Sequence, residues 1–133
     1  MGQNQKLIKK GNMEPISKIP FHTDAPLKRF SMLSKKIIPD AHTHVAVHIV
    51  DANKNEMPEY TKIHKHNADE INLILSEDDK LTYEIQLDDK VHTVSSPSSV
   101  FIPKGTSHKA KAVSGKGTFV CIILSNNYTT TKG

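Results

Sequence analysis

The sequence predicts an all-β domain, folded as a sandwich or as a closed jelly-roll barrel. Two observations lead to this prediction. About nine short runs rich in Val, Ile, Thr, Tyr and Phe are separated by turn residues, and none has the length and 3.6-residue period of a long helix. The chain has 133 residues, which is enough for one domain with a single core and too few for two.

The chain divides into an irregular, basic N-terminal arm (residues 1–28), a β-barrel (29–126) and a C-terminal tail (127–133). The arm has no sustained hydrophobic period, and Gly and Pro residues interrupt it. Residues 1–36 carry eight Lys/Arg and two acidic residues, a net charge of +6, whereas the remainder carries −2. A nucleic-acid-binding domain usually carries its positive charge on a folded face, so we expect no nucleic-acid partner.

The expected strands follow one another with short connections. In order they are 30–38, 42–51, 60–66, 70–75, 80–87, 90–94, 99–102, 108–113 and 118–124. In the run 80–87, four apolar residues alternate with polar ones, which is typical of a strand with one buried face and one solvated face. Asp88 and Asp89 then predict a two-residue hairpin loop.

The single cysteine and the hydrophobic runs bear on the cellular environment. Cys121 has no second cysteine to pair with, and its apolar neighbours indicate a small buried residue. No stretch has the length of a membrane span. We therefore expect a cytoplasmic protein with no membrane partner.

Two stretches share the outline HxH, three residues, then another possible metal ligand. In the first, from His42 to His48, no turn residue interrupts the strand, so His48 lies about 13 Å from His44 and cannot share a metal ion with it. We expect the Val/Ile face of this strand to be core and its histidines to face solvent or a subunit contact. The alternative is that His44 and His48 line a cavity.

The second stretch, from His64 to Glu70, contains the turn-forming triplet Asn67-Ala-Asp69. A turn here ends one strand after His66 and starts another at Glu70, which brings the carboxylate back beside the two histidines. Two imidazoles and a carboxylate are a suitable ligand set for a divalent transition ion.

His108 is the candidate for a fourth ligand. It follows the tight turn Pro103-Lys-Gly-Thr-Ser107, and Ala110 and Ala112 share its face of the next strand. Small side chains beside a histidine leave room for a bound molecule.

The motifs His64-x-His66-x-x-x-Glu70 and Pro103-x-Gly105-x-x-His108 together resemble the two conserved motifs of the cupin superfamily. The resemblance covers residues 40–124. It implies a small jelly-roll barrel (double-stranded β-helix) of two facing sheets, in which one divalent metal ion (Fe, Mn, Ni, Cu or Zn) is bound. The implied ligands are His64, His66, Glu70 and His108.

A metal site of this kind predicts that the protein binds a small molecule and converts it to a product. Three neutral imidazoles and one carboxylate leave a divalent ion positively charged, with two open positions if it is six-coordinate. We expect a metal-dependent enzyme (an oxygenase, isomerase or lyase) that acts on a small anionic or oxygen-chelating molecule. The alternative is a non-catalytic cupin that binds or senses a sugar or small acid.

Other residues have weaker signals. Tyr60, His44 and His48 are weak candidates for a general acid or base, because they could lie on the cavity wall. His92 is more simply a surface residue of its strand. Ile71, Leu73 and Leu75 form an apolar outward face, which predicts a homodimer.

Overall fold

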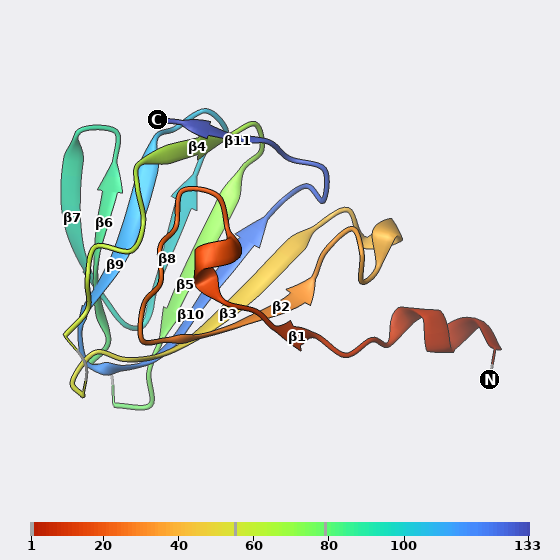
Figure 1. Cartoon of the computed structure of the whole chain (residues 1–133), viewed down its shortest axis with the longest axis horizontal. Helices are drawn as coiled ribbons and strands as arrows, with labels where there is room; N and C mark the ends of the chain where they lie inside the picture. Colours follow the sequence, from red (N-terminus) through yellow and green to blue (C-terminus); the bar gives the residue numbers. More distant parts are fainter. Residues whose placement is uncertain (1, 55, 79) are drawn as a thin grey trace.

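A computed structural model describes residues 2–54, 56–78 and 80–133, and almost all of their regular structure is β (Figure 1). The strands form two antiparallel sheets, as the all-β jelly-roll prediction requires. In spatial order, the six-stranded sheet contains β1 (Asn12–Met13), β2 (Lys28–Leu33), β3 (His44–Asp51), β10 (Lys116–Ile123), β5 (Glu70–Leu75) and β8 (Ser98–Ile102). The five-stranded sheet contains β11 (Thr130–Lys132), β4 (His64–His66), β9 (His108–Ser114), β6 (Thr82–Leu87) and β7 (Lys90–Ser95).

In the described part of the chain the helices are three short 3-10 helices: η1 (Gly2–Leu7), η2 (Ile16–Lys18) and η3 (Pro39–Ala41). Within the described ranges, no helix is long and apolar enough to span a membrane.

Each of the nine predicted strands has a counterpart, with ends that differ by a few residues. The largest differences are at 30–38, where the strand ends at Leu33, and at 60–66, where only His64–His66 is a strand. β1 and β11 were not predicted, because strands of two and three residues are too short to show a period. The hairpin between β6 and β7 is present, and Asp88 takes the positive φ of 53° that such tight loops favour.

The core lies between the two sheets. Leu81, Tyr83 and Ile85 are fully buried, as their alternation predicted. The ring of Tyr83 in the five-stranded sheet stacks on that of Phe119 in the six-stranded sheet, with ring centroids 4.6 Å apart. This contact joins the two sheets across the core.

The expected orientation of β3 is wrong. His48 is buried and lies on the inner face with Ala46 and Val50, whereas Ile49 on the opposite face is 46% exposed. Hydrophobicity could not orient this strand, because the outer face of the sheet is also apolar. Burial of His48 is compensated by Arg29, which donates a hydrogen bond to its Nε2 at 3.0 Å.

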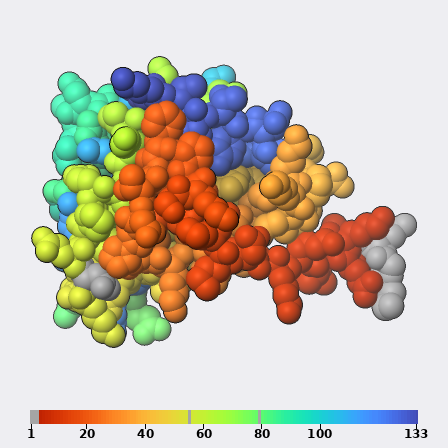
Figure 2. Space-filling model, in the orientation of Figure 1, coloured from red at the N-terminus to blue at the C-terminus, as the bar shows by residue number. Residues whose placement is uncertain are grey.

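Much of the predicted N-terminal arm packs against the barrel. Ile16 is 2% exposed, and backbone hydrogen bonds join Thr23 N–H to Tyr60 O (2.8 Å) and Lys62 N–H to Phe21 O (2.7 Å). The segment between β1 and β2 therefore crosses the face of the barrel that Figure 2 shows, whereas η1 projects away from it (Figures 1 and 2). The sequence did not indicate this, because the segment packs through isolated apolar residues.

The predicted C-terminal tail also contributes to the barrel. Residues 130–132 form β11, which pairs antiparallel with β4. The last strand thus lies directly beside the HxH motif.

Candidate metal centre

The turn after the HxH motif carries the chain from one sheet to the other. β4 belongs to the five-stranded sheet and β5 to the six-stranded sheet, so the residues 67–69 cross between them. Asp69 Oδ1 accepts a hydrogen bond from the Lys104 backbone N–H (2.8 Å), and His66 O accepts one from Gly105 N–H (2.8 Å). These bonds tie the two motif turns together, which brings Glu70 and His108 to the same place.

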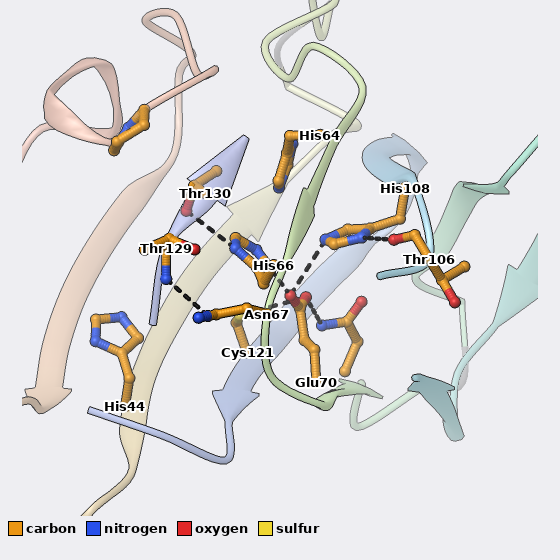
Figure 3. Close-up of polar contacts among 12 residues, drawn as sticks. His44, His64, His66, Asn67, Glu70, Thr106, His108, Cys121, Thr129 and Thr130 are labelled. Carbon is orange, nitrogen blue, oxygen red and sulfur yellow. Dashed lines mark hydrogen bonds and ion pairs between the residues drawn. The ribbon is translucent and has the colours of Figure 1, made fainter. Parts of the chain in front are cut away.

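The four predicted ligands converge inside the barrel. The ligand nitrogens of His64, His66 and His108 lie within 4.8 Å of one another, and all three residues are buried. Glu70 Oε1 lies 3.3 Å from His66 Nε2 and 3.2 Å from His108 Nε2. In Figure 3 the three rings and the carboxylate point toward one another.

The Nδ1 atom of each of the three histidines has a hydrogen-bond partner outside the cluster. His64 Nδ1 donates to Lys62 O (2.7 Å) and His108 Nδ1 donates to Thr106 O (2.9 Å), because a carbonyl can only accept. His66 Nδ1 lies 2.9 Å from Thr130 Oγ1. This arrangement fixes the rings with Nε2 facing the centre, which is how metal-ligating histidines are usually oriented.

Two atoms of this cluster lack a hydrogen-bond partner among the described residues. Glu70 Oε1 and His108 Nε2 are both buried and 3.2 Å apart, yet they are not aligned as a hydrogen bond. Leaving buried polar atoms unpaired is costly, and a cation between them would satisfy both. The residues therefore fit a metal ion held by three imidazole nitrogens and one carboxylate oxygen.

The electrostatics agree with this fit. Burial alone would raise the pKa of Glu70, but the neighbouring His108 and His66 outweigh burial and hold that pKa well below its usual range. Burial lowers the pKa of His64 to about 4. For His108 burial also lowers the pKa, but the Glu70 carboxylate outweighs it, and the net shift is upward. Glu70 is thus an anion at neutral pH and His64 is neutral, as metal binding requires.

Two further side chains hold the other oxygen of Glu70. Asn72 Nδ2 donates to Oε2 at 2.8 Å, and Cys121 Sγ lies 3.5 Å from the same atom. Burial raises the pKa of the Cys121 thiol well above its usual value, so the thiol keeps its hydrogen. Both residues orient Glu70 without competing for a cation.

The centre opens into a cavity of about 330 Å³. Six of the eight histidines of the chain line it, together with apolar side chains of both sheets. These histidines are His22, His44, His48, His64, His66 and His108. The alternative expectation, that His44 and His48 line a cavity, is therefore correct, and His42 lies exposed outside it.

The other candidate acids and bases are placed less favourably for proton transfer. Tyr60 lines the cavity, but its hydroxyl accepts a hydrogen bond from the Ala112 N–H (3.2 Å), and burial raises its pKa to about 12. His48 is buried and close to Arg29, which together lower its pKa to about 3. His92 lies exposed on β7, as expected.

Sequence reasoning missed three cavity residues that come from outside the motifs. Arg29 on β2 lies 5% exposed in the cavity, His22 from the N-terminal segment lies 5.4 Å from the His64 ring, and Tyr128 contacts the rings of His44 and His66. Nothing in their local patterns marks them, because Arg29 reaches the cavity through the pairing of β2 with β3, and His22 and Tyr128 lie in segments outside the named strands.

No protein-family model matches the sequence, and no curated protein matches it. Solved structures do match. A cupin 2 domain-containing protein from Halorhodospira halophila has a TM-score of 0.61 and 16% identity, over 80% of this chain and 70% of the other. The polyketide cyclase RemF from Streptomyces resistomycificus has a TM-score of 0.61 and 16% identity, over 99% and 84%.

A variant of the oxalate decarboxylase OxdC from Bacillus subtilis also matches. Its TM-score is 0.60 at 10% identity, over 94% of this chain and 33% of the other. Identities this low show a shared fold, and that fold is the one that the two motifs implied.

Proposed function

We propose that this chain, which has the cupin fold, is a metal-dependent enzyme that acts on a small anionic or oxygen-chelating molecule. The observation that supports the proposal best is the convergence, in the lining of a cavity, of three buried histidines and a Glu70 oxygen that has no hydrogen-bond partner among the described residues. The reaction class we expect is oxygenase, isomerase or lyase.

In this proposal His64, His66, His108 and Glu70 hold one divalent transition ion. Such an ion, when bound, supplies a Lewis acid that binds and polarises an oxygen of the substrate. The chain itself orients the bound molecule and excludes water from it. Ile85, Ile102 and Phe119 are buried apolar walls of the cavity, and they limit access of water to the bound molecule.

Two matched structures belong to proteins that are named as enzymes, a polyketide cyclase and an oxalate decarboxylase. They indicate that this fold can host catalysis, and they do not select a reaction for this chain, because one fold serves many functions.

The first test concerns the metal. Protein purified without chelators should carry close to one transition-metal ion per chain, measured by plasma emission spectrometry. The double variant His64→Ala/His66→Ala should lose the ion and stay folded, whereas His92→Ala, on the surface, should keep it. Wild-type protein that holds no metal and cannot be loaded would refute the proposal.

The second test concerns turnover. Protein is loaded anaerobically with ferrous or manganous ion, and oxygen uptake is then measured with a panel of small acids, thiols and diketones. Consumption of a panel member, lost in the double variant, supports an enzyme.

One observation favours a second function, a non-catalytic module that binds or senses a sugar or small acid. The Tyr60 hydroxyl and the Nε2 atoms of His48 and His44 already accept hydrogen bonds from Ala112 and Arg29, so their proton-transfer capacity is reduced. If no panel member is consumed but several raise the melting temperature, this second function is the better one.

A further inference from the structure

Arg29 forms a second polar centre in the cavity, outside the four-ligand cluster. Its Nε donates to Glu14 Oε1 (3.0 Å), Nη1 to His48 Nε2 (3.0 Å), and Nη2 to His44 Nε2 (3.4 Å). A guanidinium has five N–H groups, so these three bonds leave two of them without a partner in the described part of the chain. The side chain is only 6% exposed, so the two remaining N–H groups are largely withdrawn from bulk water.

His48 adds a third donor. Because a guanidinium can only donate, His48 Nε2 must accept, and the ring hydrogen must therefore be on Nδ1. His48 Nδ1 is buried and has no hydrogen-bond partner among the described residues. The pKa of His48 is lowered to about 3 by burial and by Arg29, which agrees with a neutral ring.

Three donors without acceptors therefore belong to two residues that line the same cavity as the metal ligands. Unpaired buried donors are costly, and a group that satisfies the two free N–H groups of Arg29 must supply at least two acceptor lone pairs. A carboxylate supplies about four and matches the planar fork of a guanidinium.

The charges around Arg29 allow an anion to bind beside its guanidinium. Glu14 is its only carboxylate partner within the described residues, and the Glu14 side chain is 26% exposed, so it neutralises the guanidinium incompletely. His44 and His48 have lowered pKa values and add no positive charge at neutral pH. Lys109, which also lines the cavity, is paired with Glu59 at 3.7 Å.

We infer that the Arg29 guanidinium, held in place by His44 and His48, forms a carboxylate-binding subsite, and that the ligand of this cavity is a small organic acid. The acid places a carboxylate on the Arg29 guanidinium, and the rest of the molecule extends toward His64, His66 and His108. The cavity of about 330 Å³ limits the ligand to a small molecule. The inference deepens the proposed function, and it relies on that function only for the metal end of the ligand.

The test is a calorimetric titration of zinc-loaded protein with acetate, malonate and succinate, with malonamide as the uncharged analogue of malonate. At least one carboxylate should bind, and malonamide should bind at least tenfold more weakly than malonate. Arg29→Gln should weaken carboxylate binding at least tenfold. Arg29→Lys, which keeps the charge and loses the fork, should weaken it less.

Two variants serve as controls. Lys28→Gln removes the same charge from the adjacent exposed residue and should leave affinity within twofold. Glu14→Gln removes the negative charge beside Nε and should leave carboxylate affinity equal or higher. A merely structural role of the Glu14–Arg29 pair would instead weaken binding in both Glu14→Gln and Arg29→Gln.

The inference is overturned if none of the three acids binds to the wild type, or if Arg29→Gln binds them as tightly as the wild type does. Zinc content is measured on the same samples. If neither zinc nor any other divalent transition ion binds, the proposed function fails, whereas the same titrations of the metal-free protein still test the Arg29 subsite. Circular dichroism of each variant shows whether it is folded.

Discussion

Thr130 shows how a residue outside both motifs can control the metal centre. Its hydroxyl lies 2.9 Å from Nδ1 of His66, and it is the only side-chain oxygen among the three outer partners of the histidines. A backbone carbonyl cannot be removed by substitution, so Thr130 is the outer partner that mutagenesis can test directly.

We expect Thr130→Val to weaken metal affinity by about 10–100-fold, because the ring of His66 loses the partner that orients it. Competition with a chromophoric chelator measures this. Thr131→Val, next to it and exposed on β11, is the matched control and should bind metal as the wild type does. Equal affinity of the two variants would show that Thr130 does not orient His66.

The buried histidines predict a dependence of stability on pH. Folded His48 and His64 have pKa values of about 3 and about 4, against 6.5 for a free histidine, chiefly because they are buried. Above pH 6.5 both are neutral in the folded and unfolded chains and contribute nothing. Between pH 6.5 and about 4 the unfolded chain binds protons that the folded chain does not, so stability falls as pH falls.

For metal-free protein we therefore expect the free energy of unfolding to decrease from pH 6.5 to pH 4.5, by up to about 1.4 kcal/mol per pH unit for each of these histidines. His108, whose pKa is raised, acts above this range: its contribution to stability is lost as the pH rises above 6.5 and is nearly constant below it. Urea titrations across this range should show a smaller decrease in His48→Gln and an unchanged one in His92→Gln. An identical profile in His48→Gln would contradict the burial argument.

The four residues that converge could be predicted from the sequence, because turn residues separate His66 from Glu70 and precede His108. It could not predict Arg29, Tyr128 or Thr130. Each of these reaches the site from a segment without a motif, and only the pairing of β2 with β3 and of β11 with β4 brings those segments there.

Among the elements, β3 and the segment before β2 show why alternation can mislead. β3 has apolar residues on its outer face and histidines on its inner face, the reverse of the usual pattern. A buried histidine is acceptable there only because β2 supplies Arg29 opposite His48 in the register. The orientation of β3 thus depends on Arg29 of the neighbouring strand β2. The alternation of residues within β3 alone could not reveal this.

The packed N-terminal segment predicts a large contrast between two similar substitutions. Ile16→Ala, at a residue that is 2% exposed in the core, should reduce the free energy of unfolding by about 2–5 kcal/mol. Ile8→Ala, at a residue that is 77% exposed, should change it by less than about 0.5 kcal/mol. Urea denaturation measures both, and equal effects would show that residues 12–27 do not pack as described.

The outer face of the six-stranded sheet is largely apolar. Ile49, Leu75 and Phe101 on β3, β5 and β8 are each about half exposed, at 46%, 47% and 56%. Val120 and Leu73 lie directly paired between them. A continuous apolar face of this kind usually marks an interface.

We therefore expect a homodimer through this face, measured by light scattering. Leu73→Asp should shift the protein toward the monomer, because it places a charge at the centre of the face. Val113→Asp, on β9 of the other sheet, should leave the dimer intact. A monomeric wild type would contradict the prediction.

The position of β10 between β3 and β5 has a kinetic consequence. Ile123 pairs with His44 on one side and with Glu70 on the other, so both neighbours must wait for a strand that comes much later in the chain. Such non-local pairing places folding in the millisecond-to-second range rather than in microseconds. Until β10 docks, β5 has no neighbour on that side to hold Glu70 across from the histidines. Capture of a metal ion should therefore be a late event in folding rather than its nucleus.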